Sequence, residues 1–165
     1  MADYKNYLLK RFKWVSKIYD LLCAPTKNIR KAPLKLLPIK KSTKILEVGT
    51  GTGNISIELS KHSQLVFAGD ISWEMLKNAI KKNKNKKVKF LIFDGRFLPF
   101  HNKTFEYGII ATVLHECPEE VRLEILEELK RVCKEAILVI DYSIPKNKIL
   151  GVISKFILSL YESKY

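Results

Sequence analysis

The sequence has few cysteines and no long hydrophobic run. Its three cysteines, Cys23, Cys117 and Cys133, are odd in number and lack the paired short spacings of a zinc site. No segment approaches the roughly 18 consecutive apolar residues that a membrane-spanning helix needs, and the N-terminus has no apolar signal core. These absences argue against a disulfide framework, a bound metal and a membrane span. We expect a soluble, cytoplasmic protein with reduced thiols.

Acidic residues are also scarce. The chain has 17 Asp and Glu against 30 Lys and Arg, a net charge of +13, which is typical of partners of nucleic acid or anionic membranes but also of a lysine-rich proteome. Most of the charge is lysine, whereas arginine dominates base recognition, so a nucleic-acid partner is possible but not favoured. Two basic stretches stand out: residues 21–46, which contain no acid, and residues 81–89, which contain six lysines.

Length and hydrophobic patterning predict one α/β domain. The 165 residues are 47% hydrophobic, enough for a core. Residues 4–23 have apolar side chains at helical spacing up to Pro25, and a short helix is expected after Thr26, bent at Pro33 and stopped before Pro38. Strands and helices then alternate, which predicts a doubly wound parallel sheet with helices on both faces. The expected strands are 44–48, 65–69, 88–92, 106–111 and 136–142, and the expected helices are 53–62, 73–83 and 118–132.

The turn after the first strand is rich in glycine. Gly49, Gly51 and Gly53 follow residues 44–48, and glycine lets a backbone take positive φ and approach a ligand closely. The dinucleotide fingerprint is G-x-G-x-x-G, but here the third glycine comes one residue early. Glu47 precedes the turn, where a carboxylate would repel a pyrophosphate but can hold an ammonium group. This pattern favours S-adenosylmethionine over NAD.

Carboxylates end two further strands. Asp70 lies 17 residues after Gly53, where a doubly wound sheet places an acid that accepts both ribose hydroxyls. As an alternative, Asp70 or Ser72 caps the following helix. Asp94-Gly95 follows the third strand, where the carboxylate can accept the adenine amino group, although Asp-Gly is also an ordinary turn. With Glu47, these acids would contact the methionine end, the ribose and the adenine in order.

With these residues in place, the sequence resembles class I S-adenosylmethionine-dependent methyltransferases. It is similar to the methyltransferase type 11 branch that includes the quinone-biosynthesis C-methyltransferases, from about Tyr19 to Ile144. Glu106 stands where the family usually has aspartate. The motifs that carry the resemblance are Leu-Glu-Val-Gly-Thr-Gly-Thr-Gly at 46–53, Gly-Asp-Ile-Ser at 69–72 with Met75, Asp94-Gly95, Leu-Pro-Phe at 98–100 followed by Phe-Glu-Tyr at 105–107, and Val-Leu-His at 113–115.

The resemblance implies a site and a division of the chain. It implies a Rossmann-like single domain over 1–165, with an N-terminal helical lid (1–40), a cofactor-binding core (41–145) and a C-terminal helix (146–165). Tyr19, at the end of the first helix, would lie over the cofactor as part of the lid, or would only be core. The implied cofactor-binding residues are Tyr19, Glu47, Gly49, Thr50, Gly51, Gly53, Asn54, Asp70, Ile71, Met75, Asp94, Gly95, Arg96, Ala111 and Thr112.

The implied reaction transfers a methyl group from S-adenosylmethionine to a small molecule, leaving S-adenosylhomocysteine. Such a transfer needs alignment more than a dedicated base. His115 is a weak catalytic candidate that would orient or deprotonate the acceptor, or equally a structural group bonded to backbone. The alternatives are an RNA or protein methyltransferase that uses the basic stretches, an inactive cofactor-binding module, and, least favoured, an NAD-dependent oxidoreductase.

The resemblance also implies a strand order of 3-2-1-4-5. Family members continue into two further strands, whereas after Ile144 this sequence predicts only one helix. Strand 136–142 would then be an apolar edge, which is a template for unwanted pairing. We expect the last helix or a second subunit in a homodimer to cover it, or the chain to be a truncated form.

Overall fold

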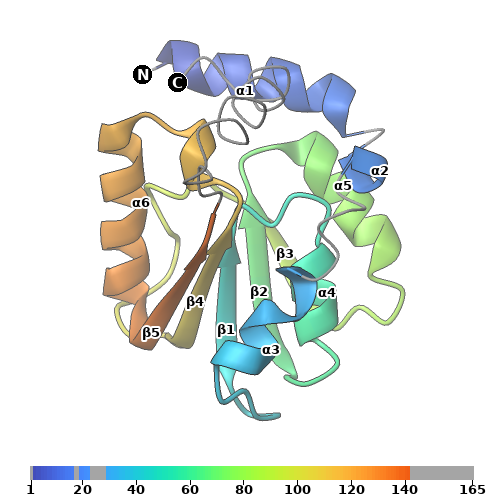
Figure 1. The fold of residues 1–165 in the computed structure, drawn as a ribbon, viewed down its shortest axis with the longest axis vertical. Helices are drawn as coiled ribbons and strands as arrows, with labels where there is room; N and C mark the ends of the chain where they lie inside the picture. The colour runs from blue at the N-terminus through green and yellow to red at the C-terminus, as the bar shows by residue number, and fades with distance from the viewer. Residues whose placement is uncertain (1, 17–18, 23–28, 142–165) are drawn as a thin grey trace, which may run out of the picture.

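A five-stranded parallel sheet forms the centre of the molecule. In the computed structural model, which describes residues 2–16, 19–22 and 29–141, the strand order is β3-β2-β1-β4-β5 and every pairing is parallel (Figure 1). This confirms the predicted order. The strands are β1 (Lys44–Val48), β2 (Leu65–Asp70), β3 (Val88–Ile92), β4 (Phe105–Ala111) and β5 (Cys133–Ile140).

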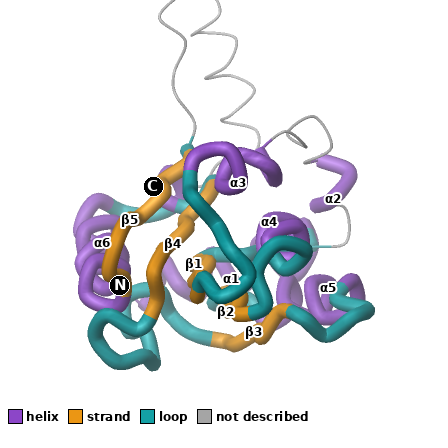
Figure 2. Tube along the Cα trace, turned by 90° about the horizontal axis from the view of Figure 1, so that it is seen from below, coloured by secondary structure: helices purple, strands orange, loops and turns teal. Residues whose placement is uncertain are grey.

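Helices cover both faces of the sheet and its carboxyl end. Seen along the strands, α6 lies on one side of the sheet, and α3 and α4 lie on the other (Figure 2). Helix α1 lies across the carboxyl ends of the strands (Figure 1), so a cavity at those ends has a helical roof. The helices are α1 (Ala2–Val15), α2 (Tyr19–Leu22), α3 (Ala32–Leu36), α4 (Asn54–Leu59), α5 (Trp73–Lys82) and α6 (Glu119–Val132).

Each face of the sheet has its own core, because side chains alternate along a strand. In β1, Ile45 packs with α4 and α3, whereas Leu46 packs with α6 and α1. Four phenylalanines extend the α6-side core under the segment that follows β3. Phe67, Phe93, Phe100 and Phe105 meet edge to face, with ring centroids 4.8–6.1 Å apart, a geometry that stabilises beyond burial alone.

The N-terminal helix ends earlier than predicted. The single helix expected over 4–23 is wrong, because α1 ends at Val15 and a separate α2 begins at Tyr19. Asn78 of α5 donates a hydrogen bond from Nδ2 to the Ser16 carbonyl at 2.9 Å. This bond joins the residue that follows α1 to α5. Tyr19 starts a helix instead of ending one.

The boundaries of α4 and β5 also differ from the prediction. Helix α4 begins at Asn54, one residue late, because Gly53 is its left-handed cap, and it ends at Leu59, before the predicted residue 62. Strand β5 begins at Cys133, directly after α6, and pairs there with Phe105; it ends at Ile140 rather than 142. The helix predicted after Ile144 lies outside the described residues.

Gly53 offers a test of how the turn is packed. Its φ is +76°, and a Cβ there would lie 2.9 Å from both Ala79 Cβ and Phe90 Cζ. We expect Gly53→Ala to lower the free energy of unfolding by about 2–4 kcal/mol, from left-handed strain and overpacking together. Denaturant unfolding measures this loss.

Gly51→Ala is the matched control. Gly51 also has positive φ (+55°), but the nearest atom to a Cβ there, in Tyr19, is 3.7 Å away. This variant should lose only the strain contribution, about 1–2 kcal/mol. Equal losses in the two variants would contradict the packing role of Gly53.

Candidate functional site

The glycine turn is anchored on the neighbouring strand. The N–H groups of Gly49 and Thr50 both donate to the Gly69 carbonyl in β2, at 2.8 and 3.0 Å. Gly49 has φ +72°, and a Cβ at this position would collide with the Val113 side chain. The turn therefore needs glycine at 49 for both conformation and space.

Asp70 joins the end of β2 to this turn. Its Oδ2 accepts from the Gly51 N–H and its Oδ1 from the Ser72 N–H, both at 2.8 Å. Burial raises the pKa of Asp70, and these backbone donors oppose the shift. The cap of α5 is Ser72, whose Oγ accepts from the Met75 N–H. Asp70 is thus not the cap, and each of its oxygens keeps acceptor capacity, because a carboxylate has about four lone-pair sites.

Glu47 is buried at the end of β1, with 2% of its surface exposed. Thr50 Oγ1 donates to its Oε2 at 2.8 Å. Burial raises the pKa of Glu47 to about 7, hydrogen bonds from Thr50 and Ser56 oppose the shift, and the charge of Asp70 adds to it. Among the described residues, neither Glu47 nor Asp70 forms an ion pair with lysine or arginine. A cationic ligand would therefore be favoured between them.

Asp94, after β3, is paired with Arg96. The guanidinium donates from Nε to Oδ1 at 3.0 Å and from Nη2 to Oδ2 at 2.7 Å. Burial acts to raise the pKa of Asp94, but the hydrogen bonds and charge of Arg96 outweigh it and lower the pKa. An adenine amino group at Asp94 would share this carboxylate with Arg96, an arrangement that the sequence did not predict.

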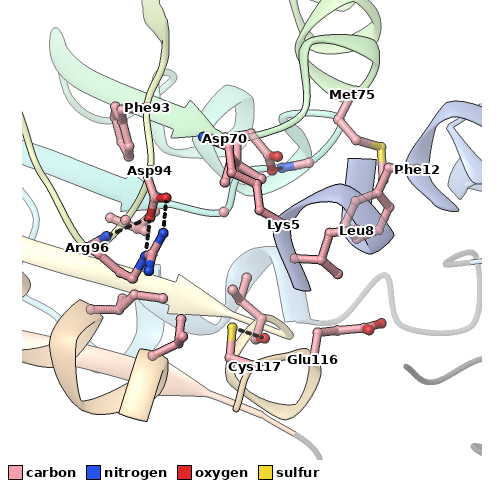
Figure 3. A pocket seen from close by; sticks show the side chains of 18 of the residues that line it. Lys5, Leu8, Phe12, Asp70, Met75, Phe93, Asp94, Arg96, Glu116 and Cys117 are labelled. Carbon is pink, nitrogen blue, oxygen red and sulfur yellow. Dashed lines mark hydrogen bonds and ion pairs between the residues drawn. The ribbon is translucent and has the colours of Figure 1, made fainter. Parts of the chain in front are cut away.

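Two cavities open beside these residues, under α1 and α2. In the first, Asp94 and Arg96 lie on one side, and Leu8 and Phe12 of α1 lie on the other (Figure 3). Of the residues predicted to bind a cofactor, the first cavity is lined by Tyr19, Gly49, Gly51, Asp70, Ile71, Met75, Asp94, Gly95, Arg96 and Thr112, and the second by Tyr19, Glu47, Gly49, Thr50, Asn54, Ala111 and Thr112.

Tyr19, Gly49 and Thr112 line both cavities, so these residues mark their junction. The ring of Tyr19 lies over Gly51, with its Cε1 3.7 Å from the position of a Cβ there. The next residue, Asp20, links α2 to the glycine turn by hydrogen bonds. Its carboxylate accepts from Thr52 Oγ1, Asn54 Nδ2 and Lys82 Nζ at 2.7–2.9 Å.

Gly53 and His115 line neither cavity. Gly53 serves the packing of α4 against α5, as described above. His115 lies in a short 3-10 turn (Leu114–Glu116) after β4. Its Nδ1 is 2.6 Å from Asp141 Oδ1, and its backbone N–H donates to Asp141 Oδ2 at 3.1 Å. If His115 had only a structural role, we expected its imidazole to bond to backbone. The structure instead places the imidazole against the carboxylate of Asp141.

Sequence reasoning missed two parts of this site. Arg30 lines the second cavity with Glu47; it falls in the acid-free stretch 21–46, where only the summed charge drew attention to it. The inner face of α1 lines the first cavity, and Tyr4 Oη donates to Cys117 Sγ at 2.9 Å there. The helical spacing of apolar residues predicted the apolar face of α1, but it did not predict that this face lines a cavity. Within the part of the chain that the structure describes, no group of three metal-ligating side chains occurs.

A doubly wound parallel sheet, a glycine turn at the reversal of strand order and acids at neighbouring strand ends define the Rossmann-like nucleotide-cofactor-binding class. Within it, a family described as a methyltransferase domain matches residues 45–136. The chain belongs to this family, among the class I S-adenosylmethionine-dependent methyltransferases.

Relatives and solved structures agree with this assignment. The demethylmenaquinone methyltransferase of Staphylococcus carnosus is 34% identical over 139 residues, covering 79% of this chain and 57% of the relative. The ubiquinone/menaquinone biosynthesis C-methyltransferase of Rickettsia prowazekii is 32% identical, covering 56% of this chain and 41% of the relative. A crystal structure of a SAM-dependent methyltransferase from Aquifex aeolicus is 30% identical with a TM-score of 0.62, covering 72% of this chain and 66% of that one. The chain thus spans roughly half the length of these curated relatives.

Proposed function

We propose that the protein transfers a methyl group from S-adenosylmethionine to a small aromatic acceptor of the quinone type. One observation carries the proposal: two buried carboxylates, Glu47 and Asp70, have no cationic partner among the described residues and flank a glycine turn at the junction of two cavities. S-adenosylmethionine supplies a reactive methyl group on a positively charged sulfur. The acceptor class comes from the names of the relatives, which methylate demethylmenaquinone or act in ubiquinone and menaquinone biosynthesis.

The two cavities suit the two ends of this cofactor. We assign the adenosine to the first cavity, with Asp70 on the ribose and Asp94 with Arg96 at the adenine. The methionine end goes to the second cavity, where Glu47 would hold its ammonium and Arg30 its carboxylate. Tyr19, at the junction, would cover the sulfur. In this arrangement the remaining predicted residues of both cavities contribute backbone or packing surface to the cofactor, and Gly53 shapes the turn from outside.

The apolar side of the first cavity under α1 suits the acceptor. Leu8 and Phe12 lie there, across the cavity from Asp94 and Arg96 (Figure 3), and such a surface fits an aromatic ring better than a phosphodiester backbone. His115 was the candidate that orients or deprotonates the acceptor; it lines neither cavity, and Asp141 holds its imidazole, so this role stays a prediction.

We propose that residues 1–40 form a lid on a core at 41–145, within one domain that includes the segment 146–165. Strand β5 is the edge of the described sheet, and Val139 on it is exposed. A cover for this edge, from the last helix or from a second subunit in a homodimer, stays a prediction.

Two measurements test the proposal. Calorimetry should show one S-adenosylmethionine bound per chain, and labelled methyl groups should appear in a demethylated quinol supplied as acceptor. Absence of binding at millimolar cofactor would refute the proposal. Binding without a labelled product from the quinol, from RNA or from protein would favour the inactive module. Label in RNA, with affinity that falls steeply as salt rises, would favour the nucleic-acid alternative.

A further inference from the structure

Both tryptophans of the chain are exposed. Trp14 and Trp73 are the only two in the sequence, and 74% and 52% of their surfaces face solvent. Tryptophan is highly buried on average in folded proteins. Packing in the protein's own core therefore does not explain why both tryptophans are present.

Each tryptophan shares a helix face with lysines. In α5, Trp73, Lys77 and Lys81 follow one another at intervals of four, which places them on one face. In α1, Lys10 and Trp14 have the same spacing, and Lys13 lies beside them. The opposite face of α1 carries the buried Tyr4 and Leu8. Lys10, Lys13 and Trp14 are thus exposed on α1 and do not line the first cavity.

Lysines from the two helices line one groove. Lys13 of α1 lines it together with Lys77 and Lys81 of α5, and the hydrogen bond from Asn78 to the Ser16 carbonyl holds the two helices side by side at this point. We call Lys10, Lys13, Trp14, Trp73, Lys77, Ile80 and Lys81 the tryptophan–lysine face; Ile80, 47% exposed, adds apolar surface between the lysines.

The charge of this face is positive. Glu74 pairs with Lys77 at 2.8 Å and Asp20 with Lys82 at 2.9 Å. Lys10, Lys13 and Lys81 form no ion pair with any described residue. The one arginine in α1, Arg11, instead pairs with Glu116, which lines the first cavity. The cations of the tryptophan–lysine face are therefore all lysines.

We propose that the tryptophan–lysine face docks the protein on an anionic lipid bilayer. Tryptophan favours the boundary between headgroups and acyl chains, and each lysine near an anionic surface contributes about 1 kcal/mol. Nucleic acid fits less well, because its recognition relies on the planar guanidinium fork of arginine. Among the described residues no helix is long and apolar enough to cross a membrane, so this contact is peripheral.

Docking in this way would bring the roof of the cavity to the lipid. Helix α1 carries the tryptophan–lysine face outside and lines the first cavity inside with Leu8 and Phe12. An apolar acceptor dissolved in the bilayer would then be within one helix diameter of the cavity. The delivery of an acceptor depends on the proposed function, whereas the docking depends only on the residues of this surface. Docking can therefore be measured without cofactor or acceptor.

Vesicle binding tests the proposal directly. With vesicles of 70% phosphatidylcholine and 30% phosphatidylglycerol, we expect the 165-residue chain to co-sediment and its tryptophan emission to shift to shorter wavelength. Pure phosphatidylcholine vesicles should bind far less, and added salt should release the protein. Since both tryptophans belong to the proposed face, the emission reports on this face alone.

Paired lysine variants locate the contact. We expect Lys10→Ala/Lys13→Ala to weaken partitioning onto anionic vesicles about 30-fold, from the contribution of two lysines. The matched control is Lys40→Ala/Lys41→Ala, which removes two exposed lysines at the amino end of β1, and it should bind as the unmodified chain does. Equal effects of the two pairs, no binding to anionic vesicles, or binding to single-stranded RNA without binding to vesicles would each overturn the proposal.

Discussion

Replacing Glu47 with glutamine is expected to stabilise the protein above pH 7, by about 3 kcal/mol at 1.36 kcal/mol per pKa unit. The carboxyl group has a pKa of about 7 in the folded chain against 4.5 as its ordinary value. Between these pH values the folded chain holds a proton that the unfolded chain releases, so stability falls as pH rises through this window. Glutamine cannot ionise, so the penalty disappears. Denaturant unfolding at pH 4.5 and pH 8 measures the difference, which should be small at the lower pH.

Glu58→Gln in α4 is the control for this experiment. A hydrogen bond from Lys61 lowers the pKa of Glu58, so this substitution should give no gain at pH 8. Binding of S-adenosylmethionine provides an independent readout, because an ammonium beside Glu47 favours the carboxylate. Between pH 6 and 7 the unmodified chain should release a proton on binding, seen as a buffer-dependent heat. The same pH profile of stability in Glu47→Gln and in the unmodified chain would contradict the assignment.

Replacing Asp70 with asparagine is expected to weaken S-adenosylmethionine binding by about 1–3 kcal/mol, which is about 5- to 150-fold. The carboxylate already accepts from the N–H groups of Gly51 and Ser72. Its remaining lone pairs would accept the two ribose hydroxyls, whereas an amide offers one oxygen and an unwanted donor. Titration calorimetry measures the change in affinity.

The matched control for Asp70 is Ser72→Ala. Ser72 caps α5 at the same strand end, and its removal should cost about 1 kcal/mol of stability with affinity retained. If Asp70→Asn binds the cofactor as well as the unmodified chain does, Asp70 does not hold the ribose.

The sequence predicted those features that depend on residues close together in the chain, such as the strands and the glycine turn. The alternating apolar runs predicted a parallel sheet, and the family resemblance implied its strand order. The glycine turn indicated a backbone with positive φ, which Gly49, Gly51 and Gly53 all have. Asp70 could be placed because a residue that ends a strand beside such a turn has little freedom of position. Its hydrogen bond to Gly51 links two segments that the register of β1 and β2 brings together.

Contacts between distant segments could not be predicted in this way. The residue that follows α1, Ser16, accepts a hydrogen bond from Asn78, 62 residues further along the chain. The partner of His115, Asp141, lies 26 residues away. Arg30 lines the second cavity together with Glu47, Gly49 and Thr50, a contact that no residue pattern near Arg30 indicates. Each of these contacts depends on how separate helices and strands pack together. The residue periodicity within one helix or strand carries no information about such packing.

The hydrogen bonds of Asp20 have a thermodynamic consequence. One carboxylate joins α2 to Thr52, to Asn54 and to Lys82 of α5, so opening of α2 and loosening of the turn are coupled. Coupling between two equilibria is reciprocal. A molecule that tightens the turn must therefore also protect the N-terminal helices against proteolytic cleavage, and a truncation that removes them must raise the dissociation constant of that molecule, although it deletes few of the groups that contact it.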